Sequence, residues 1–258
     1  MAAIASALRL GQRIKIQGRR FLNLHEYQSA QILAAGGVTV PRGIAATSVE
    51  ECVKAAEQLS GDEVVIKSQI LAGGRGLGTF TNGFQGGVHV IPKSKTEEYA
   101  TKMIGQTLVT KQSGPEGKPV NTVLMAEKMD LVNEMYFAIL LDRAFGGPVV
   151  IACAEGGTSI EDLAEKYPEK IKKVPIGIVA GMTDQQASEI VDALEISGSK
   201  PAAIEQVKAL YGVFRDSDCT MVEVNPLAED SNGTLIAADA KLGFDDNTAF
   251  RQKDIFAQ

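Results

Sequence analysis

Aromatic residues are scarce in this chain, and acidic residues outnumber basic ones. It has no tryptophan, and aromatic residues make up 5% of its 258 positions. The formal net charge is −6, and it becomes −11 when the five basic residues of the first 20 positions are set aside. Binding nucleic acid without sequence preference needs positive charge for the phosphates and aromatic platforms for the bases. The composition therefore argues against a nucleic-acid partner.

Cysteines and long apolar runs are also few. The three cysteines, Cys52, Cys153 and Cys219, lie far apart and form no CxxC pair. This spacing argues against a disulfide framework or a zinc site, and we expect all three side chains to be buried in a protein of a reducing compartment. No uninterrupted apolar stretch is long enough to cross a bilayer, so no membrane partner is expected.

Acidic residues are missing from the start of the chain, where Glu26 is the first. An amphipathic, arginine-bearing segment without acids is typical of an organelle transit peptide, which we expect over residues 1–20. A flexible basic tail is the alternative. The basic residues are Arg9, Arg13, Lys15, Arg19 and Arg20, and the apolar face is Ile4, Leu8, Leu10 and Ile14.

Helical and strand-like segments follow one another without a regular β-α-β rhythm. This order predicts an α+β fold with much antiparallel sheet. The segment Thr110–Pro119 is rich in Gly, Pro and Lys and is expected to be an exposed loop. Helices are expected to run from the Asn23–Glu26 capping box to Gly36–Gly37, to follow the Ser48 cap, and to span Thr96–Ile104, Glu161–Glu165, Asp184–Leu194 behind a Thr183 cap, and Pro201–Asp216. Strands are expected over Val64–Ile70, Val88–Ile91, Thr122–Glu127, Met135–Asp142, Val149–Cys153, Thr220–Val224 and Thr234–Asp239.

A glycine-rich segment, Gly73–Gly78, follows the first of these strands. Successive N–H groups in such a loop can form a concave anion site, and Lys67 and Arg75 would add positive charge. The segment lacks the helix that a Rossmann loop opens and the Gly-Lys-Ser/Thr ending of a P-loop. A phosphate site and a plain exposed hairpin therefore both remain possible.

Two strands near the C-terminus carry a possible metal site. A turn at Ser231–Gly233 would pair residues whose numbers sum to 464, which places Asn225 opposite Asp239 and Glu223 opposite Lys241. Opposed amide and carboxylate oxygens suit Mg²⁺, which takes one or two such ligands. Alternatively, Asn225 belongs to a turn and Asp239 is a solvated acid.

Glu127 and Glu134 flank a short connector between two strands. Such connectors often line clefts, but the two carboxylates alone are more simply interpreted as surface acids.

Taken together, these segments resemble the β subunit of the succinate–CoA ligase family (ADP-forming type), specifically its ATP-grasp portion, from about Phe21 to the C-terminus. The resemblance implies an ATP-grasp fold of two lobes with mixed, largely antiparallel sheets that grip a nucleotide. The matching strings are LHEYQ (24–28), VIKSQILAGGRG (65–76), GGVH (86–89), EVNP (223–226), DAK (239–241), FDDN (244–247) and FRQ (250–252).

The resemblance also implies a role for each candidate residue. Nucleotide phosphates would be held by Lys67, Gly74, Arg75 and Gly76. Glu127 would border the adenine, and Glu134 would bind the ribose. Asn225 and Asp239 would hold Mg²⁺, and Glu223 would face a phosphohistidine as the catalytic residue.

The implied reaction converts ATP, succinate and CoA reversibly to ADP, phosphate and succinyl-CoA in the tricarboxylic acid cycle of the mitochondrial matrix. Only His25 and His89 are present, and neither belongs to a nucleophile set. The carrier histidine is therefore expected on an α subunit, in a heterodimer. The C-terminal CoA-ligase domain of the family is expected to be absent from this chain.

Leu77 departs from the pattern of many relatives, and Pro41 and Ser68 bear on the choice of nucleotide. Many relatives carry lysine where this chain has Leu77, so one charge beside the phosphates is lost. GTP-specific relatives tend to carry Gln at Pro41 and Ala at Ser68, which favours ATP/ADP here. Two alternatives stay open: a malate–CoA ligase subunit, and a truncated, non-catalytic nucleotide-binding or assembly module.

Overall fold

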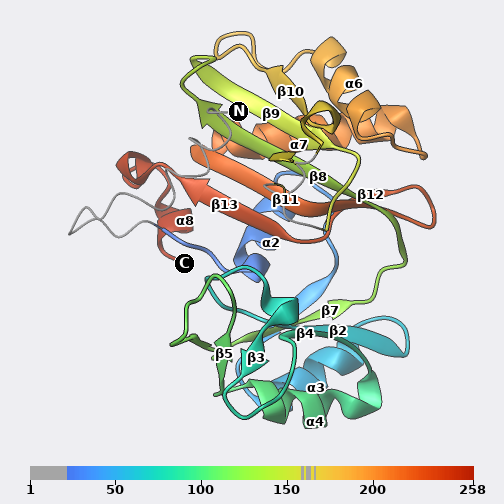
Figure 1. Cartoon of the computed structure of the whole chain (residues 1–258), viewed down its shortest axis with the longest axis vertical. Coiled ribbons are helices and arrows are strands. Elements are labelled where there is room, and N and C mark those ends of the chain that lie inside the picture. Colours follow the sequence, from blue (N-terminus) through green and yellow to red (C-terminus); the bar gives the residue numbers. More distant parts are fainter. Residues whose placement is uncertain (1–21, 158–159, 161–163, 166) are drawn as a thin grey trace. The chain divides into compact units, whose positions relative to one another are not determined.

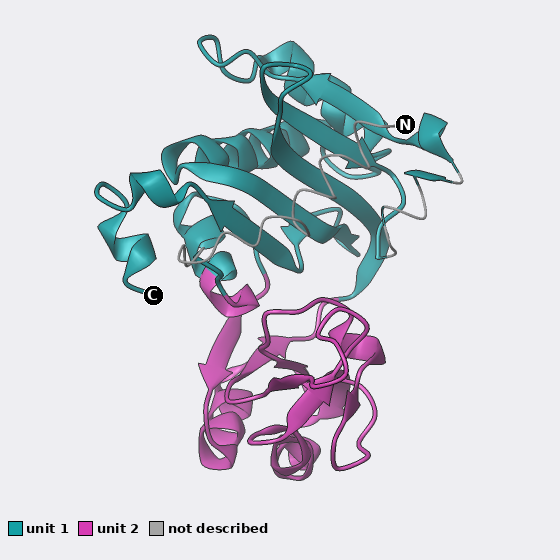
Figure 2. Ribbon diagram, turned by 60° about the vertical axis from the view of Figure 1, so that its left-hand side comes forward, with its two compact units in different colours: residues 1–24, 29–40, 130–258 teal, residues 25–28, 41–129 magenta. Residues whose placement is uncertain are grey.

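The computed structural model describes residues 22–157, 160, 164–165 and 167–258. The transit-peptide prediction and most of the predicted Glu161–Glu165 helix lie outside these residues. The chain divides into two compact units, shown in teal and magenta in Figure 2. Unit 1 holds Ser29–Val40 and Asp130–Gln258 with the segment that ends at Leu24, and unit 2 holds His25–Gln28 and Pro41–Met129.

Unit 2 is built on a four-stranded antiparallel sheet with two helices against one face. The Ser48 hydroxyl caps the first helix by accepting the Glu51 N–H (3.2 Å). Val64 and Ile66 are buried against these helices, so strand alternation places Lys67 on the opposite face. The strands are β1 (Gly43–Ala46), β7 (Val123–Glu127), β2 (Glu63–Ser68) and β4 (Val88–Pro92) in spatial order, and the helices are α3 (Val49–Gln58) and α4 (Thr96–Met103) (Figure 1).

A second, three-stranded sheet in unit 2 corrects one prediction. It consists of β3 (Thr79–Phe80), β5 (Thr107–Val109) and β6 (Lys118–Pro119). The last two residues of the predicted Thr110–Pro119 loop therefore form a strand, because their backbone pairs with β5. Two short 3-10 turns complete the unit, η1 (Arg75–Leu77) before β3 and η2 (Lys93–Lys95) before α4.

Unit 1 is built on a six-stranded antiparallel sheet. Helices α6 and α7 pack on one face of it, together with Leu33 of α2 (Figure 1). The Thr183 capping box begins α6, and Pro201 lies in the first turn of α7, both as predicted. The strands are β10 (Lys172–Pro175), β9 (Gly147–Cys153), β8 (Leu131–Asp142), β11 (Cys219–Asp230) and β12 (Leu235–Ala237), with β13 (Ala240–Phe244) also paired to β11. The helices are α2 (Glu26–Ala35), whose residues up to Gln28 belong to unit 2, α6 (Asp184–Ala193) and α7 (Lys200–Asp216), and a 3-10 turn η3 (Pro168–Lys170) precedes β10.

The other face of this sheet carries the polar candidates of unit 1. Tyr136 and Ala138 of β8 are buried there, away from the α6–α7 core. Ala138 pairs with Glu223 of β11, and Glu134 lies two residues before Tyr136. Alternation therefore places Glu134 and Glu223 on the face opposite α6 and α7.

The predicted hairpin near the C-terminus has the expected register but longer strands. From Met221 to Glu229, β11 pairs with β13 and β12 at residue numbers that sum to 464, including Glu223 with Lys241 and Leu227 with Ala237. The second strand is split into β12 and β13 because the ladder is interrupted at Ala238–Asp239. The Asp230 carboxylate orders the turn by accepting the N–H groups of Asn232 and Thr234.

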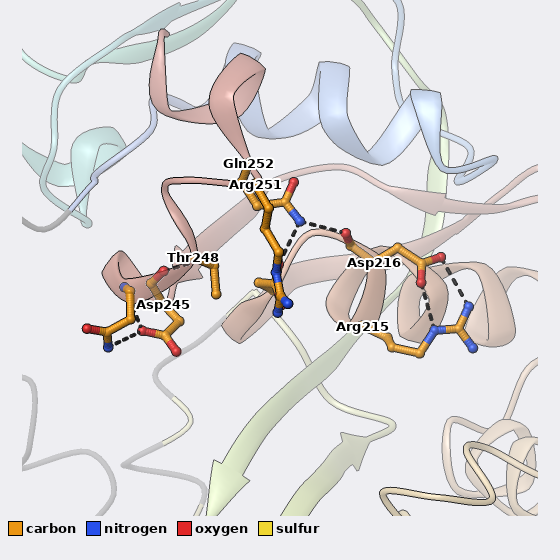
Figure 3. A network of polar contacts seen from close by, with 8 residues as sticks. Arg215, Asp216, Asp245, Thr248, Arg251 and Gln252 are labelled. Atoms are coloured by element: carbon orange, nitrogen blue, oxygen red, sulfur yellow. Dashed lines mark hydrogen bonds and ion pairs between the residues drawn. The ribbon is translucent and has the colours of Figure 1, made fainter.

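The turn η4 (Asp246–Thr248) and helix α8 (Lys253–Phe256) follow β13. Side chains of this segment form hydrogen bonds and an ion pair with the connection between α7 and β11 (Figure 3). Arg251 forms an ion pair with Asp218 and, by donating to it, holds the pKa of that carboxyl below its ordinary value. The Gln252 amide donates to the Asp216 carbonyl (2.9 Å) and to Asp218 (2.7 Å). The FRQ string thus has a structural role.

All three cysteines are buried, as predicted. Burial raises the pKa of Cys52 and Cys219 to about 12, so both remain neutral thiols. None of the described helices combines the length and apolar character that a membrane span requires.

Candidate functional site

The glycine-rich segment of unit 2 forms a closed loop around Arg75. The Arg75 carbonyl accepts N–H groups from Gly78 (3.1 Å) and Gly87 (2.8 Å). Gly74 adopts a left-handed conformation with φ of +73°. Among the residues that the structure describes, the exposed Gly74 and Gly76 have no hydrogen-bond partner for their N–H groups. These two donors are suited to bind an anion.

Gly87 is required where the loop meets β4. A Cβ atom there would lie 2.6 Å from the Leu108 side chain and 3.1 Å from the Arg75 carbonyl oxygen. Any larger residue would displace the backbone N–H that the Arg75 carbonyl accepts, and the glycine therefore keeps the loop closed.

Lys67 and Arg75 meet at one carboxylate, that of Glu26. Glu26 Oε1 lies 2.8 Å from Lys67 Nζ, and Glu26 Oε2 lies 2.7 Å from Arg75 Nη1. The three side chains are largely buried, with 6% of Glu26, 16% of Lys67 and 11% of Arg75 exposed. Burial acts to raise the pKa of Glu26, but the two cations outweigh it and hold that pKa below its ordinary value.

This arrangement corrects the predicted start of α2. Glu26 does not complete a capping box with Asn23; instead the Gln28 side chain accepts the His25 N–H (2.8 Å). Glu26 is thereby left to pair with the two cations. The LHEYQ string, which contains Glu26, was the sequence signal for a functional role. The capping pattern instead accounted for Glu26 as a helix cap, without Lys67 or Arg75.

The predicted metal ligands of unit 1 lie directly opposite each other. The Asn225 N–H donates to the Asp239 carbonyl (3.0 Å), which is the pairing expected from the register. Asn225 and Pro226 form a bulge in β11. They lie between the pairs Val224–Phe137 and Leu227–Met135, whereas β8 has only Tyr136 between the same two pairs. A bulge bends its strand and redirects a side chain, and proline cannot donate to the ladder.

A loop that the sequence analysis did not single out holds the Asn225 amide. The Gly157 N–H donates to Asn225 Oδ1 (2.8 Å), and this bond fixes which end of the amide is the oxygen. A Cβ on Gly157, whose φ is +68°, would lie 2.3 Å from Glu134 Oε2. The structure therefore brings Glu134, Gly157 and Asn225 together. The Glu-Gly-Gly run at 155–157 was the missed signal.

Glu223 and Glu127 have protein partners in this structure. Glu223 Oε2 lies 3.3 Å from Lys241 Nζ, and 19% of the Glu223 side chain is exposed. Glu127 accepts the Ser60 N–H (3.0 Å) and lies 3.7 Å from Arg42. Glu127 belongs to unit 2 and Glu134 to unit 1, so the predicted pair is not brought together within one unit.

The oxygen donors of Asn225 and Asp239 suit a hard divalent cation. Within the described residues, no three His, Cys, Asp or Glu side chains are grouped so that they could hold a metal ion. Mg²⁺ does not need such a group, since it usually takes one or two protein oxygens together with substrate phosphates and water. The donor set therefore fits Mg²⁺ better than a transition metal.

The fold and the loop geometry agree with the comparison to known families. The sequence profile described as "ATP-grasp domain" matches residues 23–229. The chain belongs to the ATP-grasp domain family. The match includes Lys67, Arg75 and Asn225, and it ends before Asp239.

Similar curated proteins are succinate–CoA ligase β subunits. This ATP-grasp chain is 55% identical to the mitochondrial ADP-forming subunit of Arabidopsis thaliana, over 98% of this chain and 61% of that protein. It is 45% identical to the mitochondrial GDP-forming subunit of Bos taurus, over 95% of this chain and 57% of that protein. The chain thus spans about 60% of the length of the relatives it matches.

Solved structures show the same fold at low identity. The dinucleotide-forming acetyl-coenzyme A synthetase 1 of Ca. Korarchaeum cryptofilum superposes with a TM-score of 0.64 at 17% identity, covering 93% of this chain and 100% of that chain. The ATP citrate lyase of Methanothrix soehngenii gives a TM-score of 0.65 at 17% identity, covering 93% of this chain and 55% of that one. At this identity the likeness establishes the fold only.

Proposed function

We propose that this chain is the nucleotide-binding part of a succinate–CoA ligase β subunit of the ADP-forming type. The observation that carries the proposal is the 55% identity over 98% of the chain to such a subunit. The clustering of Lys67 and Arg75 beside the glycine-rich loop supports it from the structure. The chain spans part of its relatives, so succinate, CoA and the complete reaction belong to the proposal.

The phosphates of ATP or ADP are assigned to unit 2. Lys67 and Arg75 would neutralise their charge, and the N–H groups of Gly74 and Gly76 would bind their oxygens. Glu127 would border the adenine, and its acceptance of the Ser60 N–H would order the end of β7 there.

Unit 1 would contribute the metal ligands and the ribose contact. Asn225 and Asp239 would hold Mg²⁺, which neutralises phosphate charge when bound. Glu134 would bind the ribose hydroxyls. Glu223 would face the phosphohistidine of the partner, with Lys241 Nζ 3.3 Å from its Oε2.

In the reaction, the γ-phosphoryl group of ATP passes to a histidine of an α subunit and leaves ADP behind. The phosphohistidine then phosphorylates succinate, and CoA displaces phosphate to give succinyl-CoA. Transfer of a phosphoryl group depends mainly on positioning and charge stabilisation. The cations of this chain would supply both by holding the phosphates in place and offsetting charge that develops on the γ-phosphoryl group.

A preference for adenine nucleotides rests on the relatives and on Pro41. ADP-forming relatives from plants are 55–56% identical to this chain, whereas the mammalian GDP-forming ones are 44–46% identical. Pro41 has no side-chain amide that could read guanine. Ser68 is fully buried, so it would influence the nucleotide only through its neighbours.

The proposed partner is a succinate–CoA ligase α subunit in a heterodimer, and the proposed compartment is the mitochondrial matrix. The relatives carry the word mitochondrial in their names, and the acid-free leader is of the matching type.

Incubation of the chain with an α subunit and γ-labelled ATP tests this function. We expect label on an α-subunit histidine, and a rate lower by about 10²–10³-fold in Lys67→Met, because one preorganised positive charge is lost. Lys54→Met, which replaces an exposed lysine of α3, serves as the matched control, and phosphoryl transfer by this variant should proceed at the normal rate. Absence of labelled histidine with the folded, unsubstituted chain would favour the non-catalytic module instead.

A further inference from the structure

We propose that Glu26 is a positioning residue of the phosphate site: its carboxylate holds Lys67 and Arg75 in place for the nucleotide phosphates. The proposal rests on the function proposed above, and it adds a residue that has no assigned role there. Glu26 lies in the first turn of α2, 41 positions before Lys67 and 49 before Arg75, so only the fold brings the three together.

Both oxygens of the Glu26 carboxylate are engaged. Oε1 accepts from Lys67, and Oε2 accepts from Arg75 and from the Gln69 amide (3.2 Å). Gln69 is itself fixed, because only 2% of it is exposed and its Oε1 accepts the Tyr27 N–H (3.3 Å). The carboxylate is therefore held at a set position from both the helix and the strand end.

A fixed carboxylate between Lys67 and Arg75 lowers the cost of ordering these two side chains beside a phosphate. Lys67 and Arg75 are long side chains of like charge, which lose conformational freedom when they are ordered beside a phosphate. Glu26 orders them beforehand and offsets their mutual repulsion. The cluster of three still carries a net charge of +1, so it continues to attract a phosphate. Such preorganisation strengthens binding by lowering the cost of ordering.

A purely structural role explains the arrangement less well. The helix start is capped by Gln28, which leaves the Glu26 side chain unused for capping. A buried ion pair is weak evidence for stability, because well-packed apolar residues often stabilise a fold equally well. The position of the cluster beside the glycine-rich loop, where Gly74 and Gly76 present their N–H groups, points instead to the ligand.

A double-mutant cycle on the full chain tests the proposal, with calorimetric titration of ADP and of inorganic pyrophosphate. Glu26→Gln is expected to weaken binding of both ligands about tenfold, since the amide would present an N–H to one of the two cations. In the Lys67→Met background the same change should cost only about threefold, because one of the two positioned cations is gone. Glu26→Asp keeps the charge on a shorter side chain, and its affinities should lie between those of the unsubstituted chain and those of Glu26→Gln.

Glu50→Gln is the matched control, since Glu50 is an exposed acid in the first turn of α3 in the same unit. It should leave both affinities unchanged. The positioning role would be overturned if Glu26→Gln weakened binding equally in both backgrounds, or if it tightened binding. In either case, ADP binding by the unsubstituted chain would still uphold the proposed function. Glu26-dependent binding of pyrophosphate without binding of ADP would uphold the positioning role and reject the nucleotide function. Binding of neither ligand to the folded chain would overturn both.

Discussion

Replacing Asp239 by alanine is expected to abolish the Mg²⁺ dependence of nucleotide binding while leaving the fold intact. Asp239 is the charged member of the Asn225–Asp239 pair, and the neutral amide alone holds a hard cation weakly. Loss of this ligand should weaken ADP binding in the presence of Mg²⁺ by about 100-fold and stop phosphorylation of an α subunit. Calorimetric titration with ADP, with and without Mg²⁺, measures the effect.

Asp192→Ala is the matched control for this substitution. Asp192 is an exposed acid of α6 in the same unit, and its ion pair with Lys200 lies on the surface. The control should bind ADP and Mg²⁺ as the unsubstituted chain does. Mg²⁺-dependent binding that survives in Asp239→Ala would show that the hairpin does not hold the metal.

Replacing Glu229 by alanine is expected to lower the free energy of unfolding by about 3–5 kcal/mol. Glu229 is fully buried and accepts hydrogen bonds from the Asn133 amide (2.9 Å), the Ser197 N–H (3.0 Å) and hydroxyl (2.9 Å), and the Gly198 N–H (2.7 Å). Truncation would leave these buried donors without an acceptor. Urea unfolding followed by circular dichroism measures the loss.

The same carboxylate predicts a pH dependence. Burial acts to raise the pKa of Glu229, but its hydrogen bonds outweigh burial and hold that pKa below the ordinary 4.5. Its stabilisation is therefore complete above pH 4.5 and is lost as the pH falls below that value. Between about pH 5 and pH 3, Glu229→Gln should lose less stability than the unsubstituted chain, because an amide does not titrate.

Glu205→Ala serves as the control, because Glu205 is an exposed acid on α7 of the same unit. It should unfold as the unsubstituted chain does, and its pH dependence should be normal. A Glu229→Ala variant within about 0.5 kcal/mol of the unsubstituted chain would show that the buried carboxylate contributes little net stability.

The register of the C-terminal hairpin was predictable because the position of its turn determines which residues lie opposite each other. Asp230 and Gly233 close a tight turn, and the pairs on both sides of the interruption at Ala238–Asp239 have a sum of 464, up to Glu223 and Lys241. Helix starts at Ser48, Thr183 and Pro201 were predicted for a similar reason, since a cap acts within one turn.

Contacts between distant segments could not be predicted in this way. The Glu26 carboxylate has a local pattern that fits a helix cap, and nothing nearby in the sequence indicates that Lys67 and Arg75 are its partners. The Gly157 N–H reaches Asn225 across 68 positions, and its loop has no regular period. The bulge at Asn225 also depends on β8, and no turn or local pattern in either strand indicates that β8 pairs with β11.

Titration of the unsubstituted chain with ADP and with GDP, each with and without Mg²⁺, tests the central proposal most directly. A working ATP-grasp site of the ADP-forming type predicts binding that requires Mg²⁺ for full affinity and that is tighter for ADP than for GDP. Binding of neither nucleotide by a demonstrably folded chain, or equal binding of both without Mg²⁺, would contradict it.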